Sequence, residues 1–216
     1  MGKFTFVRGN HFLHPKDVMD LMREGFVEAD DEIDAQVSAE HIQIVLENYL
    51  AVNQEADLFF FIEVPVKLDE EKIVKPPTET EPGILASNSR KVYYLDHIDA
   101  ETCLKLLALF KEILINDGLS AFGFGTKDSE IGKYKYNEIL LYNHDEKRDW
   151  KNIFALAGIP EKEDLTFADD FFTDENPGVA ERYDDANGRT VYDVIEVLKE
   201  NGLYEAEIRS DEDEDK

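Results

Sequence analysis

Residues 100–117 most constrain the fold, because they form an apolar segment with helical signals at both ends. Asp99 stands where an N-cap accepts free backbone N–H groups, and Glu101 complements the positive end of the helix dipole. Gly118 predicts a left-handed residue just beyond the C-terminus. Apolar side chains cover most of the circumference between these ends, so the helix must be covered on more than one side. They are Cys103, Leu104, Leu106, Leu107, Ala108, Leu109, Phe110, Ile113, Leu114 and Ile115.

The segments around this helix favour β-structure. Residues 92–95, 121–125 and 134–142 are short β-favouring runs, and residues 126–133 form a polar, glycine-containing loop between the last two. We interpret the runs as neighbouring antiparallel strands with the helix packed on their face. Residues 58–64 are continuously apolar and predict an interior strand that ends at Pro65.

Boundary signals along the chain complete the predicted architecture. Residues 4–7 predict a first strand and residues 28–34 a charged linker or exposed turn. Helical signals or spacing follow Pro15, Ser38, Trp150 and Thr190, and residues 164–173 favour a short helix. We therefore predict an α+β fold, with a mixed, mainly antiparallel sheet of about five or six strands and helices packed on it.

The sequence predicts one domain followed by a tail. Residues 1–204 form the α+β domain, and residues 67–90 form a long, exposed loop with three prolines inside it. This loop interrupts the periodic pattern as an insertion, and we prefer that interpretation to an interdomain linker. Residues 205–216 are acidic and predict a disordered tail, because their final stretch, 210–216, has no apolar side chain to bury.

Charge restricts the classes of ligand. The chain has 23 basic and 49 acidic residues and a formal net charge of −26, which repels phosphate backbones and anionic lipid surfaces. We therefore expect no nucleic acid or membrane partner. The start of the chain lacks the apolar region of a signal peptide, and no apolar run is long enough to span a bilayer. With one cysteine, Cys103, on an apolar helix, the sequence predicts a cytoplasmic protein.

Motifs for chemistry are weak. Gly123 and Gly125, followed by Lys127, resemble a phosphate-binding turn, but a strand pattern follows instead of a helix. We prefer the interpretation that these glycines relieve crowding between neighbouring strands. His11 and His14 lie only partly within a helical pattern, and residues 174–188 do not fit an EF-hand loop, so we predict no metal centre and no cofactor.

The acidic segment 161–187 carries the functional hypothesis. It has ten acidic and two basic residues with aromatic residues among them, which is typical of a surface that attracts a cationic protein and holds it by apolar anchors. We predict a non-enzymatic module that binds a basic protein partner, with residues 28–40 as a second acidic segment. Immunity proteins and nucleic-acid mimics use such surfaces, and the likeness is one of charge only. The predicted partner-binding residues are Phe167, Asp169, Asp170, Phe171, Phe172, Asp174, Glu175, Tyr183, Asp184 and Asp185.

Two alternatives stay open. The first is an enzyme of unassigned chemistry with a site near residues 123–127 and His97, where acidic and basic residues are balanced. The second is an acidic housekeeping domain without a discrete site, in which the carboxylates confer solubility. Catalytic residues stay unassigned, because carboxylate pairs carry little information among 49 acidic residues.

Overall fold

The computed structural model describes residues 3–66, 73–75, 84–85, 89–144 and 148–210, and these form an α+β fold. Its centre is an eight-stranded antiparallel sheet with the order β12-β7-β4-β8-β9-β10-β3-β2. The strands are β2 (Gly25–Ala29), β3 (Glu32–Gln36), β4 (Leu58–Pro65), β7 (Ser89–Ile98), β8 (Ala121–Gly125), β9 (Ser129–Lys133), β10 (Glu138–Asn143) and β12 (Tyr204–Ser210).

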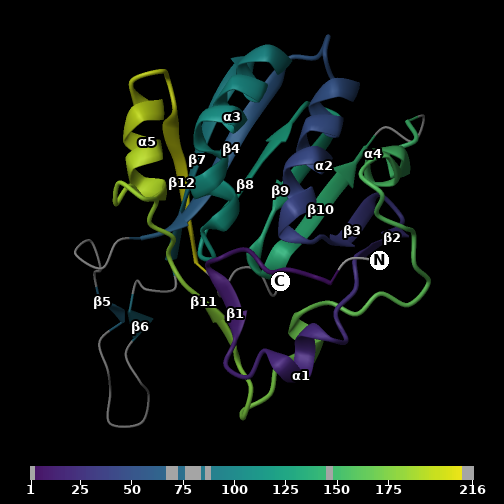
Figure 1. The fold of residues 1–216 in the computed structure, drawn as a ribbon. Helices are drawn as coiled ribbons and strands as arrows, with labels where there is room; N and C mark the ends of the chain where they lie inside the picture. Colours follow the sequence, from purple (N-terminus) through teal and green to yellow (C-terminus); the bar gives the residue numbers. More distant parts are fainter. Residues whose placement is uncertain (1–2, 67–72, 76–83, 86–88, 145–147, 211–216) are drawn as a thin grey trace.

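Four helices lie on one face of this sheet, as Figure 1 shows. They are α2 (Ala39–Val52), α3 (Ala100–Asn116), α4 (Lys151–Leu156) and α5 (Val191–Lys199). Alternate residues of β4 face them, and Leu58, Phe60, Ile62 and Val64 are all 0% exposed. The predicted interior strand is thus confirmed. The sheet, α2 and α5 cover most of the apolar surface of α3, but Leu104 and Leu109 remain 40% and 72% exposed.

A smaller layer lies beyond the lower end of the sheet in Figure 1. Here β1 (Asn10–Phe12) pairs with β11 (Gly178–Ala180), and α1 (Lys16–Met19) and the 3-10 turn η4 (Asp169–Phe171) lie beside them. Phe4, Phe12, Val18, Met22 and Ala168 form a second buried cluster in this layer. A further pair, β5 (Ile73–Lys75) and β6 (Ile84–Leu85), lies within the predicted loop 67–90, most of which is outside the described residues.

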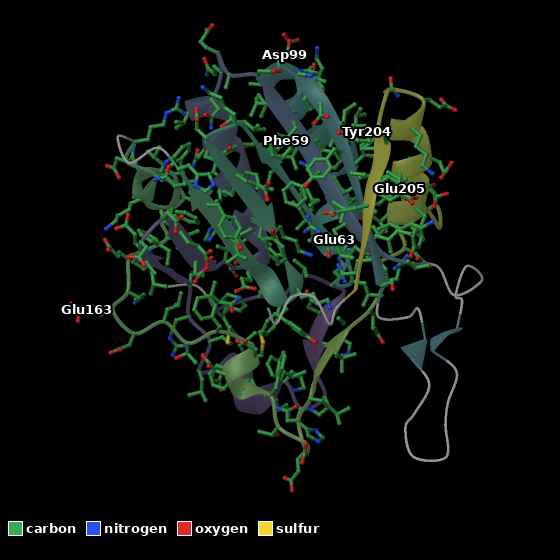
Figure 2. The ribbon with its side chains drawn as sticks, turned by 180° about the vertical axis from the view of Figure 1, so that it is seen from behind. Phe59, Glu63, Asp99, Glu163, Tyr204 and Glu205 are labelled. Carbon is green, nitrogen blue, oxygen red and sulfur yellow. The ribbon has the colours of Figure 1, made fainter. Side chains whose placement is uncertain are left out.

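The opposite face of the sheet is seen from behind in Figure 2. Rings from β4 lie over glycines of β8: a Cβ on Gly125 would stand 2.2 Å from the Phe59 ring, and one on Gly123 would stand 2.5 Å from the Phe61 ring. The Gly123 Cβ would also stand only 2.0 Å from the Ile131 carbonyl oxygen. The glycines therefore relieve crowding between strands, as the preferred interpretation of this motif predicted. The chain from Gly125 turns directly into β9 and opens no helix.

Several predicted elements are wrong. Residues 28–34 are no linker; they belong to the hairpin β2–β3, whose turn at Asp30, with φ of 51°, is the exposed turn predicted as the alternative. Residues 129–133 form β9 instead of a loop, and residues 205–210 extend the sheet in β12, so the tail cannot begin at 205. Charged side chains concealed all four strands: β3 alternates between buried and partly exposed residues, β9 is almost wholly buried, and residues 204–209 of β12 are exposed.

Other errors concern the ends of elements. Residues 4–7 form no strand, and the helices predicted after Pro15 and over 164–173 shrink to α1 and η4. Asp99 does cap α3, accepting the Thr102 N–H at 2.8 Å. Gly118 is not left-handed; a Cβ there would stand 1.9 Å from the Gly9 carbonyl oxygen, so close backbone approach explains this glycine.

The contact between Gly125 and Phe59 gives a testable prediction. Gly125→Ala should lower the free energy of unfolding by about 1–3 kcal/mol, because the new methyl group displaces the ring. In a Phe59→Ala background the same change should cost at least about 1 kcal/mol less. Urea denaturation of the four proteins of this cycle measures the coupling. Gly123→Ala is the control, since its clash is with a backbone carbonyl and Phe59→Ala should not relieve it; additive effects for Gly125 and Phe59 would contradict the prediction.

Candidate partner-binding groove

The structure divides the residues predicted to bind a partner. Phe167, Asp169 and Phe172 line one groove of about 180 Å³, and the Asp170 carboxylate accepts the Phe167 N–H at 2.9 Å within the same turn. Phe171 packs against the buried cluster of the lower layer. Together these contacts fold residues 167–172 into a compact wall of the groove.

The other predicted residues lie elsewhere or have structural roles. Asp174 and Glu175 are exposed in a turn, and Asp184 is exposed as well. Tyr183 bonds through its hydroxyl to Glu112 and Arg8. Asp185 is 9% exposed and accepts the Asn187 and Arg189 N–H groups, which lowers its pKa to about 2. None of these five predicted residues lines the groove.

Gln36, at the end of β3, joins the two walls of the groove. Its side-chain oxygen accepts the Ala168 N–H at 3.0 Å, and its side-chain nitrogen donates to the Tyr136 carbonyl oxygen at 2.7 Å. The residue is 1% exposed, so these bonds form away from solvent. The 167–172 segment is thereby fixed against the end of the sheet.

The second wall is the turn η3 (Lys135–Asn137), which connects β9 to β10. Tyr136 and Asn137 have φ of 54° and 67°, in the left-handed region. The buried Asn137 side chain holds this conformation by accepting the Val7 N–H and donating to the Thr5 and Val37 carbonyl oxygens. Strain of this kind persists only where the surroundings impose it, so the turn is a rigid part of the wall.

Aromatic side chains form the apolar part of the groove. The Phe172 and Tyr136 rings meet edge to face with centroids 4.8 Å apart. Phe172 also lies 5.5 Å from Phe12 of the lower cluster, yet 37% of it stays exposed. Its ring is therefore held in place and remains available to a partner.

Carboxylates form the polar part. Glu138, the first residue of β10, lines the groove beside Asp169, and burial raises its pKa to about 7, with further contributions from the charges of Asp34, Asp169 and Glu32. On the same sheet face, burial and the hydrogen bond to Asp34 raise the pKa of Glu32 to about 7. One Asp34 oxygen is buried without a hydrogen-bond partner among the described residues. Four carboxylates that repel one another thus extend from the groove along β3.

This combination suits a cationic side chain. A guanidinium or ammonium group placed at Glu138 and Asp169 would neutralise their repulsion, and the apolar stem would contact Phe167 and Phe172. Lys135 also lines the groove. Within the described residues no cluster of His, Cys, Asp and Glu has the arrangement of a metal site.

Sequence reasoning missed the half of the groove that the sheet supplies. The signal was the alternation Glu32-Ile33-Asp34-Ala35-Gln36, in which Ile33 and Ala35 are buried at 3% and 0% and the polar residues share the other face. Pairing of Gln36 with Glu138 then brings the acidic strand beside β10. That pairing joins residues about 100 positions apart, which no local pattern indicates.

The alternative region, His97 with residues 123–127, lies at the other end of the strands. His97, Thr126 and Lys127 line a separate cavity of about 420 Å³, whereas Gly123 and Gly125 lie within β8. The region therefore contains a cavity, but the arrangement of its residues does not identify a chemical reaction.

Comparisons with known proteins do not assign the chain to a family. No protein-family model matches the chain, and neither the curated proteins nor the solved structures searched contain a match. Among the described residues no helix is both long and apolar enough to cross a membrane. The groove must therefore be interpreted from its own geometry.

The raised pKa of Glu138 predicts how stability depends on pH. Its pKa rises from 4.5 to about 7 on folding, so the folded protein binds more protons in that interval and loses stability as the pH rises through it. Glu138→Gln mimics the neutral acid. We expect its Tm at pH 8 to exceed that of the wild type by about 3 °C, the shift expected for about 1 kcal/mol in a domain of this size.

Calorimetry at pH 5 and pH 8 measures this effect. The difference between Glu138→Gln and the wild type should nearly vanish at pH 5, where the native carboxyl group is mostly protonated. Glu163→Gln is the matched control, because Glu163 is exposed and projects from the edge of the molecule (Figure 2). An equal gain at both pH values would show that charge on Glu138 is not its cause.

Proposed function

We propose that the protein is a non-enzymatic binding module that recognises a basic protein through the groove between residues 167–172 and the η3–β10 segment. The observation that carries the proposal is the raised pKa of Glu138 beside Asp169 in an aromatic-walled groove. A group whose charge is costly in the free protein gains most when a cation arrives. The partner's contribution would be an arginine or lysine side chain.

Arginine fits the groove better than lysine. A planar guanidinium pairs with a carboxylate through two parallel N–H···O bonds and also packs against aromatic rings. Phe167 and Phe172 lie in the same groove as the carboxylates of Glu138 and Asp169. The net charge of −26 would speed the encounter with a basic protein, and the groove would supply the local contacts.

A short oligo-arginine peptide is the probe for this site. We expect the double variant Glu138→Gln with Asp169→Asn to bind it about tenfold more weakly than the wild type, equivalent to about 1.4 kcal/mol. The control is Glu163→Gln with Asp164→Asn, which removes the same charge from exposed positions outside the groove. Isothermal titration calorimetry at low salt compares the three proteins. Equal losses in both double variants would mean that the acidity acts only through net charge.

Binding should also depend on pH. Because Glu138 has a pKa of about 7, it must lose its proton before it can pair with a cation. Affinity for oligo-arginine should therefore rise about tenfold between pH 6 and pH 8. In Glu138→Gln the rise should be clearly smaller. A wild-type affinity that is flat over this range would exclude Glu138 from the binding site.

The cytoplasmic location remains part of this proposal. Cys103 is a free, buried thiol, and burial raises its pKa to about 12, which makes it unreactive and compatible with a reducing compartment.

A further inference from the structure

A second cavity lies at the end of the sheet opposite the groove. Its volume is about 420 Å³, within the usual range for small-molecule sites. The walls come from the end of α2 with the start of β4, the end of β7, the β8–β9 turn and the segment before α4. Four parts of the chain that are distant in sequence thus enclose one space.

Basic side chains from three of these parts line the cavity, two of them largely exposed at its rim. They are His97 from β7, Lys127 from the turn and Arg148 from the segment before α4. Asp57 and Asp128 also line it, but Asp57 accepts a hydrogen bond from His97 Nδ1 at 2.9 Å and Asp128 forms an ion pair with Lys127 at 3.7 Å. Asp96 accepts the Tyr204 hydroxyl at 2.6 Å. Three basic and three acidic side chains thus line the cavity, which makes it nearly neutral in a chain with a net charge of −26. Because each of the three carboxylates already has a hydrogen-bond or ion-pair partner, the cavity repels an anionic group less than the acidic remainder of the surface does.

His97 is held in a strained conformation at this site. Its φ is 57°, in the left-handed region, which is uncommon for residues other than glycine, although histidine adopts it more often than most. The hydrogen bond to Asp57 fixes the imidazole ring and raises its pKa, which favours the charged form. Backbone strain of this kind is concentrated at binding and catalytic sites.

The apolar part of the cavity is aromatic. Phe59 and Trp150 line it, and Trp150 stacks on Tyr49 with the Arg148 guanidinium 5.4 Å from the centre of its ring. The Arg148 side chain is also positioned by the Asn53 amide oxygen at 2.5 Å. Trp150 Nε1 has no hydrogen-bond acceptor among the described residues. The aromatic rings and the Arg148 guanidinium therefore line the same part of the cavity.

We infer that this cavity binds a small organic anion that carries a ring. The ring would contact Phe59 and the Trp150 edge, and the anionic group, a phosphate or a carboxylate, would be bound by Lys127, Arg148 and His97. This site is distinct in place and in charge from the groove that takes a cation. The cavity is therefore a second binding site, and the proposed partner-binding function does not require it.

Trp150 is the only tryptophan of the chain and lines this cavity, so tryptophan fluorescence responds to changes at this one place in the fold. The probes are phenyl phosphate and benzoate, which distinguish the two anionic groups, with inorganic phosphate and benzyl alcohol as partial ligands. We expect a saturable change with phenyl phosphate or benzoate, and binding at least about tenfold weaker for both partial ligands. If either partial ligand bound as tightly as the complete one, the requirement for a ring or for an anion would be overturned.

Variants assign the binding to the cavity. Lys127→Met and Arg148→Gln should each weaken binding of the preferred probe by about tenfold. Lys111→Met is the matched control, because Lys111 is an exposed lysine on α3 away from the cavity, and it should bind as the wild type does. Lys127 has a side chain that is 88% exposed, so its replacement should leave the fold intact, which circular dichroism checks. No saturable change with any probe, or equal losses in all three variants, would overturn the inference.

Discussion

Burial of one face of the eight-stranded sheet is the constraint on which the rest of the structure depends. Strands β4 and β8 supply phenylalanines that are fully buried beneath α2 and α3, and Tyr49 of α2 is buried with them. At about 25 cal/mol per Å² of apolar surface removed from water, side chains of this size dominate the stability of a domain. The helices cover only this face, so the strands must present different side chains on the other one.

On the opposite face, the rigid sheet holds charges in fixed positions and thereby changes their pKa values. Strand pairing sets Glu32, Asp34 and Glu138 on one face of β3 and β10, where neighbouring carboxylates cannot all ionise at ordinary pKa values. Elsewhere on that face the charges are matched, as in the buried ion pair of Glu63 with Arg90. The unmatched carboxylates adjoin the groove, and the matched pair lies toward the β4–β7 side of the sheet. On this face of the sheet, the carboxylates without a basic partner lie next to the groove, and the paired charges lie farther away.

The two hollows of the molecule lie at opposite ends of the same strands and differ in chemistry. The groove presents two carboxylates, one lysine and aromatic rings, and the cavity presents three basic and three acidic side chains with aromatic rings. Each forms where loops from distant parts of the chain converge on strand ends, which is where binding residues commonly lie. The two proposed sites are therefore separated by the length of the strands.

The sequence by itself determined the α+β class, the capped helix α3 and the interior strand β4, because these depend on local pattern. It also indicated Phe167, Asp169 and Phe172, which line the groove, but it grouped them with Asp185, whose carboxylate is used within its own loop. Only the tertiary structure decided that β3 pairs with β10 and that the Gln36 side chain fixes the 167–172 segment. Those contacts join residues about 100 positions or more apart, and their energies depend on burial that no local stretch of sequence displays.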